Sequence, residues 1–154
     1  MNWKKIIKTV LVLLAVALIV SFIAPKNAVP QGASTETGNR KVALAGQDIR
    51  VTVVSTSAER AKGLGGRTGL AQGEGMLFVF DTDAKYRFWM KDMFFSIDIL
   101  WLSRKGEVLD MRQNVSPATY PTAFTPSAPA RYVLELPAGF AQAYNVKIGD
   151  VVSL

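Results

Sequence analysis

The chain has 154 residues, a formal net charge of +6, and neither cysteine nor histidine. The absence of cysteine excludes disulfides, thiolate nucleophiles and a lipid anchor on a cysteine, and the absence of histidine removes the commonest general base and metal ligand. The basic residues form no dense stripe of lysine and arginine, so the sequence predicts no nucleic-acid partner.

The first predicted element is an apolar run over residues 6–24. As a helix it would reach about 28 Å, close to the thickness of the hydrocarbon core of a membrane. Lys4 and Lys5 precede the run, Lys8 lies near its start, and only Lys26 closely follows it. The positive-inside rule therefore predicts a single-pass cell-membrane protein with a cytoplasmic N-terminus and an extracytoplasmic C-terminal domain, in the periplasm or at the cell exterior.

A cleaved signal peptide is the alternative for this segment. Cleavage after Ala24 would place Phe22 at −3, and cleavage after Ala28 would place Lys26 there, whereas small residues are needed. The residues therefore favour a retained anchor over 1–24, and both interpretations export the domain.

Residues 25–40 are polar, contain proline and glycine, and show no periodicity, which predicts a flexible linker. Residues 41–154 are then a single β-rich domain. In its first part, hydrophobic patterning predicts strands over residues 41–44, 49–54 and 76–80. Thr56 and Glu59 fit a capping box that begins a short helix ending near Gly63, and a glycine-punctuated loop follows.

In the second part, a second short helix is predicted over residues 138–144, and a long loop with four prolines over 113–129. The predicted strands cover residues 86–90, 97–102, 107–112, 131–136 and 151–154. Short strands without long intervening helices predict a mainly β fold, an antiparallel barrel or sandwich-like sheet with two short helices.

Three blocks of sequence together carry a resemblance to a known family. The first block is SAERAKGL at 57–64 with GMLFVF at 75–80, and the second is FWMK at 88–91 with IDIL at 97–100. The third is ARYVLELPAG at 130–139 with KIGD at 147–150. These blocks resemble the bacterial and archaeal family called domain of unknown function 192, and they keep the family order over nearly all of residues 42–154. The resemblance implies a compact, β-rich, exported or membrane-anchored domain, and it implies no established activity.

The chain departs from the family pattern at three places. Gly65 stands where the family usually has methionine, Asp92 stands where asparagine is usual, and SPAT at 116–119 lacks a common cysteine. A function shared through those positions would be altered in this member.

The strongest candidate site contains Arg87, Trp89 and Lys91, which alternate along one predicted strand near Asp98 and the long loop. A tryptophan beside cations forms a flat surface that can stack on a sugar ring or hold an anionic group. The alternation equally allows Trp89 to face the core with the cations on a solvated edge. Because aromatic residues in strands usually pack, the pattern favours that core placement.

Asp98 lies between two isoleucines in an apolar strand, so it either points outward or pairs with a buried base. Arg67 and Arg131 are the candidate partners of Asp98. The predicted ligand-binding residues are therefore Arg67, Arg87, Trp89, Lys91, Asp98 and Arg131. The pattern favours structural pairing over catalysis, because buried charges are normally matched. Glu135 lies between two leucines and receives the same interpretation.

Other chemistries find little support, and the sequence predicts no catalytic residue, metal or cofactor. Met90 and Met93 could offer soft ligands to Cu(I), but core packing explains them better. Carboxylates for glycoside hydrolysis are available at Glu74, Asp92, Asp98 and Asp110, without a pattern that selects a pair.

The residues favour binding over catalysis. We expect a ligand-binding or accessory module of the cell envelope that takes a glycan or an anionic small ligand. The alternatives are a carboxylate-dependent enzyme acting on envelope glycans and a structural partner of an envelope protein complex.

Overall fold

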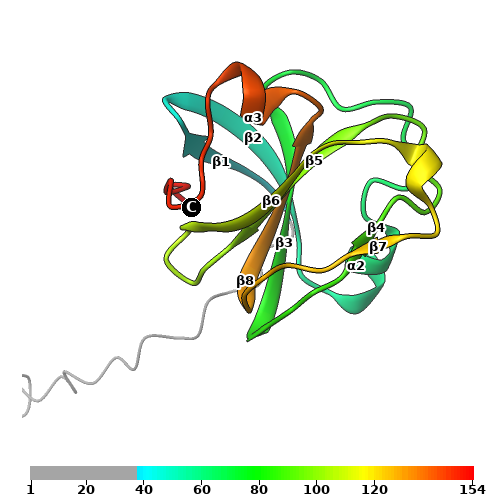
Figure 1. The fold of residues 1–154 in the computed structure, drawn as a ribbon, viewed down its shortest axis with the longest axis horizontal. Coiled ribbons are helices and arrows are strands. Elements are labelled where there is room, and N and C mark those ends of the chain that lie inside the picture. Colours follow the sequence, from blue (N-terminus) through cyan, green and yellow to red (C-terminus); the bar gives the residue numbers. More distant parts are fainter. Residues whose placement is uncertain (1–37) are drawn as a thin grey trace, which may run out of the picture. The chain divides into compact units, whose positions relative to one another are not determined.

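Six strands form one mixed sheet in the computed structural model, which describes residues 38–154 (Figure 1). In sheet order the strands are β1 (Gly38–Leu44), β2 (Gln47–Val54), β3 (Glu74–Ala84), β8 (Ala130–Pro137), β5 (Ile97–Leu102) and β6 (Val108–Val115). A separate two-stranded sheet joins β4 (Phe88–Trp89) to β7 (Ala123–Phe124). The helices are α2 (Ser57–Lys62), the 3-10 turn η1 (Pro117–Thr119) and α3 (Phe140–Ala143).

The prediction of a mainly β fold with two short helices is confirmed, but the sheet is neither wholly antiparallel nor closed. Strands β2 and β3 run parallel, because the segment between them is long enough to cross over, passing through α2 and the glycine-rich loop. Within residues 38–154 the sheet keeps two free ends at β1 and β6, so the predicted barrel is wrong.

The last residues of the chain bridge both ends of the sheet instead of forming the strand predicted over 151–154. Ser153 forms an isolated bridge with Ala43 on β1, and Val151 forms one with Glu107 in the turn before β6. These two contacts narrow the opening between the edge strands without closing it with a continuous ladder.

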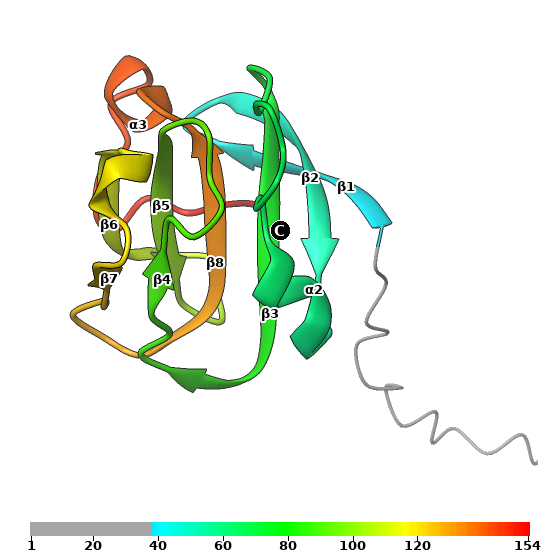
Figure 2. The same cartoon turned by 90° about the vertical axis from the view of Figure 1, so that its right-hand side faces the viewer.

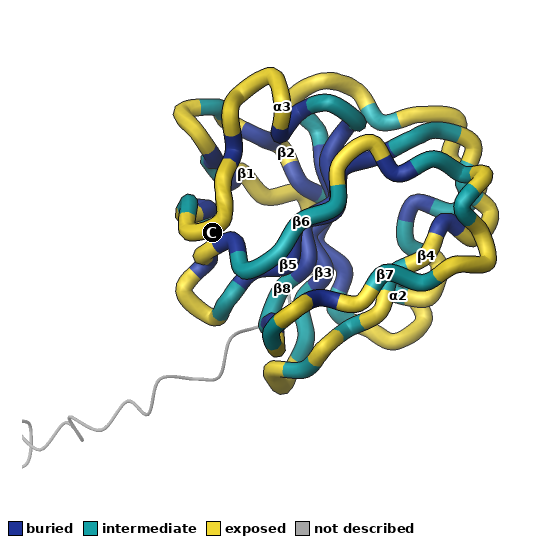
Figure 3. The backbone as a smooth tube through the Cα atoms, viewed as in Figure 1, coloured by how far each residue is buried: buried dark blue, intermediate teal, exposed yellow. Residues whose placement is uncertain are grey.

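Both faces of the central strands are covered. On one face, Leu100, Leu134 and Leu136 pack with Phe140 of α3, and on the other, Ile99, Trp101 and Val133 pack beneath β4 and the end of α2. Figure 3 shows the buried segments concentrated in β5, β8 and β3. All six residues of β5 are buried, which explains why its sequence is a continuous apolar run apart from one acid.

The predicted capping box starts α2. The Thr56 hydroxyl accepts a hydrogen bond from the Glu59 amide at 3.2 Å, and the Glu59 carboxylate accepts one from the Thr56 amide at 3.0 Å. Gly63 ends the helix with φ of 50°. The Arg60 guanidinium donates to the carbonyls of Ser55 and Val79, which ties the helix to β3.

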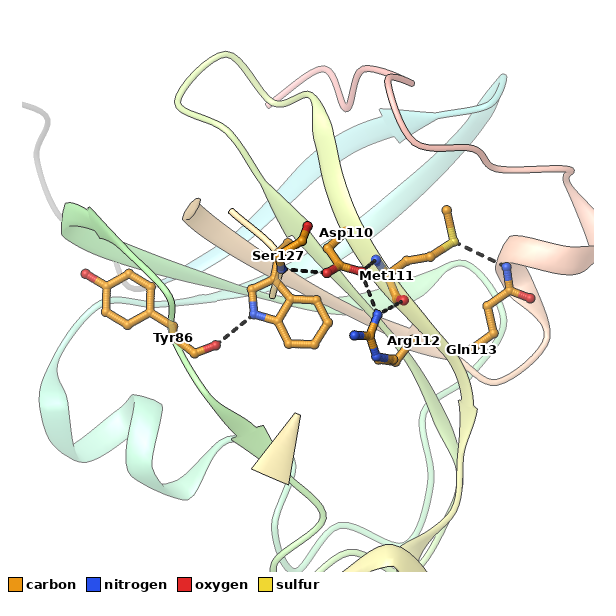
Figure 4. A network of polar contacts seen from close by, with 7 residues as sticks. Tyr86, Asp110, Met111, Arg112, Gln113 and Ser127 are labelled. Carbon is orange, nitrogen blue, oxygen red and sulfur yellow. Dashed lines mark hydrogen bonds and ion pairs between the residues drawn. The ribbon is translucent and has the colours of Figure 1, made fainter. Parts of the chain in front are cut away.

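The segment predicted as a long loop contains the end of β6, η1 and β7, and polar contacts tie this segment and the one before β4 to the main sheet. Asp110 accepts hydrogen bonds from the Ser127 amide at 2.7 Å and from Arg112 at 2.6 Å (Figure 4). The indole N–H of Trp101 donates to the Tyr86 carbonyl at 2.8 Å. The segments that carry β4 and β7 are therefore both anchored to the main sheet.

The predicted anchor over residues 1–24 and most of the predicted linker lie outside the described residues. Among the helices of residues 38–154, none has the length and apolar character needed to cross a membrane.

Candidate ligand-binding site

A cavity of about 660 Å³ lies between α2, the glycine loop that follows it, and β4. Figure 2 shows α2 and β4 in front of the main sheet, on the side that faces the viewer. Residues from four separate segments line the cavity. Three of these residues, Phe78, Phe80 and Glu135, come from the central strands β3 and β8. The volume lies in the range of about 300–1,000 Å³ that is common for small-molecule sites.

Aromatic side chains form much of the cavity wall. The ring of Phe88 packs edge-on against Phe78, with centroids 4.8 Å apart, and against Trp101 at 6.2 Å. Phe80 stacks on Tyr86 at 3.5 Å. These contacts fix the orientation of β4, because Phe88 occupies the inward position and its neighbour must point outward.

Trp89 is that neighbour, and 53% of its surface is exposed. The favoured core placement of Trp89 is therefore wrong, since Phe88 and the buried Met90 fill the inward positions instead. Tyr120 from the long loop packs edge-on against Trp89, with centroids 6.3 Å apart. An exposed aromatic pair thus stands beside the cavity.

Cationic residues surround the outer part of the cavity. Lys62, Arg87 and Lys91 line it and are exposed, and within residues 38–154 none of them forms an ion pair. Arg60 also lines the cavity and stacks on Phe80, with its guanidinium 4.9 Å from the ring centre. We call the exposed residues Lys62, Arg87, Trp89 and Lys91 the rim.

Glu135 is the buried acid of the cavity. It sits on β8 between Met76 of β3 and Ile99 of β5, and only 5% of its surface is exposed. Its Oε2 atom has no hydrogen-bond partner among the described residues. Burial raises the pKa of the Glu135 carboxyl to about 8, although the positive charge of Arg67 opposes this. The carboxyl is therefore mostly protonated and neutral at pH 7.

Comparison with known proteins identifies the family. Residues 40–154 match the model of domain of unknown function 192, described as "Uncharacterized ACR, COG1430". The chain belongs to this family. The resemblance inferred from the three sequence blocks is thus confirmed.

Two crystal structures are similar to this DUF192 domain. A protein of unknown function from Novosphingobium aromaticivorans DSM 12444 is 31% identical, with a TM-score of 0.72 over 75% of this chain and 85% of that one. A protein from Sinorhizobium meliloti 1021, named a "putative transcription regulator", is 27% identical, with a TM-score of 0.72 over 78% of this chain and 96% of that one. The search of curated proteins found no match.

Arg67 lies at a second cavity of the DUF192 domain, about 410 Å³ in volume, next to the first. Lys62, Gly63, Gly65 and Gly66 line both cavities. A Cβ atom at Gly65 would come within 2.9 Å of the Lys62 carbonyl oxygen. The position where the family usually has methionine is therefore a tightly turned backbone here, with no side chain to enter either cavity.

Asp98 and Arg131 lie apart from both cavities. Asp98 is fully buried and accepts hydrogen bonds from the amides of Asn114 (2.8 Å), Gly139 (3.2 Å) and Ala141 (2.8 Å). The prediction that an arginine pairs with Asp98 is therefore wrong, because backbone amides satisfy the Asp98 carboxylate. Arg131 instead pairs with Asp83 at 2.5 Å.

The structure thus brings Arg87, Trp89 and Lys91 together at one cavity and places Arg67 at the adjoining one. Sequence reasoning missed Arg60, Lys62 and the aromatic wall, which become neighbours only through the packing of α2 and β4. It noticed Glu135 but gave it the same reading as Asp98. Of the four acids considered for glycoside hydrolysis, Asp92 alone lines the larger cavity.

Proposed function

We propose that this DUF192 domain is a ligand-binding or accessory module of the cell envelope, and that it takes a glycan or an anionic small ligand in the cavity beside Trp89. The observation that carries the proposal is the rim, where an exposed tryptophan and three exposed cations surround a concave, aromatic-walled site, and these cations have no ion-pair partner among residues 38–154. Such an arrangement combines ring stacking with attraction for negative charge.

The charge balance of the cavity supports an anionic occupant. Four cationic residues line it, Arg60, Lys62, Arg87 and Lys91, against two acids. One of these acids, Glu135, carries little charge at pH 7 because burial raises its pKa to about 8. The local field is therefore positive, which raises the local concentration of anions and their rate of association.

The proposed location rests on the sequence of the N-terminal segment. An apolar run over residues 6–24, with its lysines mainly on the N-terminal side, supports a membrane anchor that leaves the domain outside the cytoplasm. There the ligand would come from the envelope, and an envelope protein could dock beside the rim.

The experiment is a thermal-shift screen of the full-length protein against envelope glycans and small organic anions. A ligand present at about 100 times its Kd stabilises the folded state by about 2.7 kcal/mol, which raises the melting temperature. The proposal expects Trp89→Ala to abolish the shift. Ile148→Ala removes an exposed apolar residue that lines neither cavity, and it should leave the shift unchanged.

Ligand-induced stabilisation that persists in Trp89→Ala would reject this site. The absence of any shift across the panel, together with co-purification of one fixed envelope protein, would instead favour a structural or assembly role.

A second candidate is a carboxylate-dependent enzyme acting on envelope glycans, because Asp92 and Glu135 line the same cavity. Glycosidases pair an ionised carboxylate with a protonated acid, and burial keeps Glu135 protonated at pH 7. Release of glycan fragments that stops in both Asp92→Asn and Glu135→Gln, and continues in Glu74→Gln, would favour this reading. Unchanged release in either of the first two variants would reject it.

A further inference from the structure

Two buried side-chain oxygens among residues 38–154 lack a hydrogen-bond partner, Ser55 Oγ and Glu135 Oε2. Of these two residues, only Glu135 lines either of the two cavities described above. A buried polar group left unpaired loses its hydration without a replacement and is destabilising, so folded proteins seldom retain one without a reason. Glu135 therefore needs an explanation that packing does not supply.

The other fully buried acid shows how this fold satisfies a structural carboxylate. Asp98 receives three backbone N–H groups and thereby joins β5 to the end of β6 and the start of α3. No N–H group of the described residues donates to the Oε2 atom of Glu135, although Glu135 lies in the same sheet. Its strand neighbours, Met76 and Ile99, are apolar and offer its side chain nothing to bind. The contrast separates an acid that holds the structure together from an acid that faces a cavity.

The charged groups around Glu135 do not form a partner for it either. Arg67 is exposed and lines the adjoining cavity, and its charge only partly opposes the effect of burial on the Glu135 carboxyl. No ion pair among the described residues includes Glu135. The neutral carboxyl thus keeps one O–H donor and one carbonyl acceptor available for an incoming group.

We propose that Glu135 determines the specificity of the cavity by hydrogen-bonding to an uncharged hydroxyl or carbonyl of an aromatic-ring anion, whose anionic group lies at the rim. This inference rests on the proposed binding function and names the ligand class. The orientation follows from burial, because the cations are exposed and Glu135 is buried. An anion placed beside the buried acid would lose its hydration without gaining a counter-charge.

The cavity wall favours an aromatic ring over a sugar ring. Phe78, Phe80, Tyr86 and Phe88 line the same cavity as Glu135 and Trp89, and ring faces and edges pack well on one another. A sugar would bring several hydroxyl groups into this apolar wall, and each hydroxyl without a partner would cost binding energy. The Glu135 carboxyl at the buried end of the cavity suits a ligand that carries one polar substituent on the side of its ring opposite the anionic group.

The test compares matched probes by isothermal titration calorimetry on the full-length protein. The first pair is 4-hydroxybenzoate and benzoate, and the second is 4-hydroxyphenylacetate and phenylacetate, which differ only in the far hydroxyl. Since a hydrogen bond contributes about 0.5–1.5 kcal/mol net, the hydroxylated member of at least one pair should bind about 2- to 13-fold more tightly. Glucuronate serves as the acidic-sugar comparison and should bind more weakly than that member.

Two variants of Glu135 separate recognition from folding. Glu135→Leu replaces the acid with an apolar side chain that suits its neighbours, so the fold should persist while the preference for the hydroxylated probe disappears. Glu135→Gln keeps a donor and an acceptor at this position and should retain the preference. Arg87→Gln should weaken both members of a pair equally, because it acts on the anionic group.

The outcomes distinguish the two levels of the proposal. Binding of both members that depends on Trp89, with equal affinity for each, would overturn the role of Glu135 and leave the binding function intact. A preference that survives in Glu135→Leu would overturn that role as well. Tighter binding of glucuronate, or failure of every aromatic probe to bind, would overturn the aromatic ligand class and the role of Glu135. The proposed binding function would then be decided by the thermal-shift screen and its Trp89→Ala variant.

Discussion

The pH dependence of stability should depend on Glu135. The carboxyl binds its proton more tightly in the folded protein, where its pKa is about 8, than at the ordinary value of 4.5. This contribution to stability is therefore complete below about pH 4.5 and is lost as the pH rises through 8. Glu135→Gln removes the titration and keeps nearly the same shape, so it isolates the effect.

The magnitude follows from the two pKa values. Each pH unit between them corresponds to about 1.4 kcal/mol, so the whole interval corresponds to about 5 kcal/mol. Between pH 5 and pH 7 the free energy of unfolding should fall by roughly 2 to 3 kcal/mol because of this residue. For a domain of this size, that loss lowers the melting temperature by on the order of 10 °C.

The assay is urea unfolding of the full-length protein and of Glu135→Gln at several values of pH between 5 and 9. The difference in unfolding free energy between the two proteins should change with pH in favour of the variant as the pH rises. Glu107→Gln, at an exposed position in the turn before β6, controls for the loss of a surface carboxylate. A difference in unfolding free energy between the unmodified protein and Glu135→Gln that stays constant from pH 5 to pH 8 would refute the reasoning.

Three further predictions concern the scaffold that holds the cavity. Asp98→Ala leaves three amide donors without their acceptor and should destabilise the protein by about 3 kcal/mol or more in urea unfolding, and a loss below 1 kcal/mol would contradict the proposed anchoring role. Partial burial raises the pKa of Asp110, but hydrogen bonds from Ser127 and Arg112 outweigh it and hold the pKa below 3.8. The stabilisation from the ionised Asp110 should therefore be lost only as the pH falls below 3.8. In Asp110→Asn the fall of the unfolding free energy at acid pH should become less steep, and an unchanged slope would contradict this role of Asp110. Thr56→Ala breaks the capping box and should cost about 1 kcal/mol, measurable by thermal unfolding, while Ser57→Ala should cost less.

Local patterns in the sequence predicted much of the fold. The alternation in β2, the apolar run of β5 and the Thr56–Glu59 capping box each depend on residues a few positions apart, and each appears where it was expected. The parallel pairing of β2 with β3 depends on how a long crossover packs, which no short pattern encodes. For the same reason the sequence could not show that the edge strands β1 and β6 stay apart.

The candidate site was predictable in part. Alternation placed Arg87, Trp89 and Lys91 on one side of a strand, but it could not say which side is buried. That choice is made by Phe88, whose ring finds Phe78 and Trp101, partners that come from other strands. Only tertiary contacts therefore expose Trp89.

The two buried acids illustrate the same limit. Asp98 and Glu135 each lie between apolar residues in a strand, so the sequence assigned both of them to structural pairing. What separates them is the environment beyond their own strands, three amide donors around Asp98 and a cavity beside Glu135. The hydrogen-bond partners of a buried acid reveal its role only once the fold is known.

The central claim is that the cavity beside Trp89 binds an anionic ring compound. The most direct measurement is calorimetric titration of 4-hydroxyphenylacetate and 4-hydroxybenzoate into the full-length protein and into its Trp89→Ala and Ile148→Ala variants. The account predicts saturable binding in the unmodified protein and in Ile148→Ala, and a loss of at least about 10-fold in affinity in Trp89→Ala. Equal affinity in all three proteins, or no binding in any of them, would contradict it.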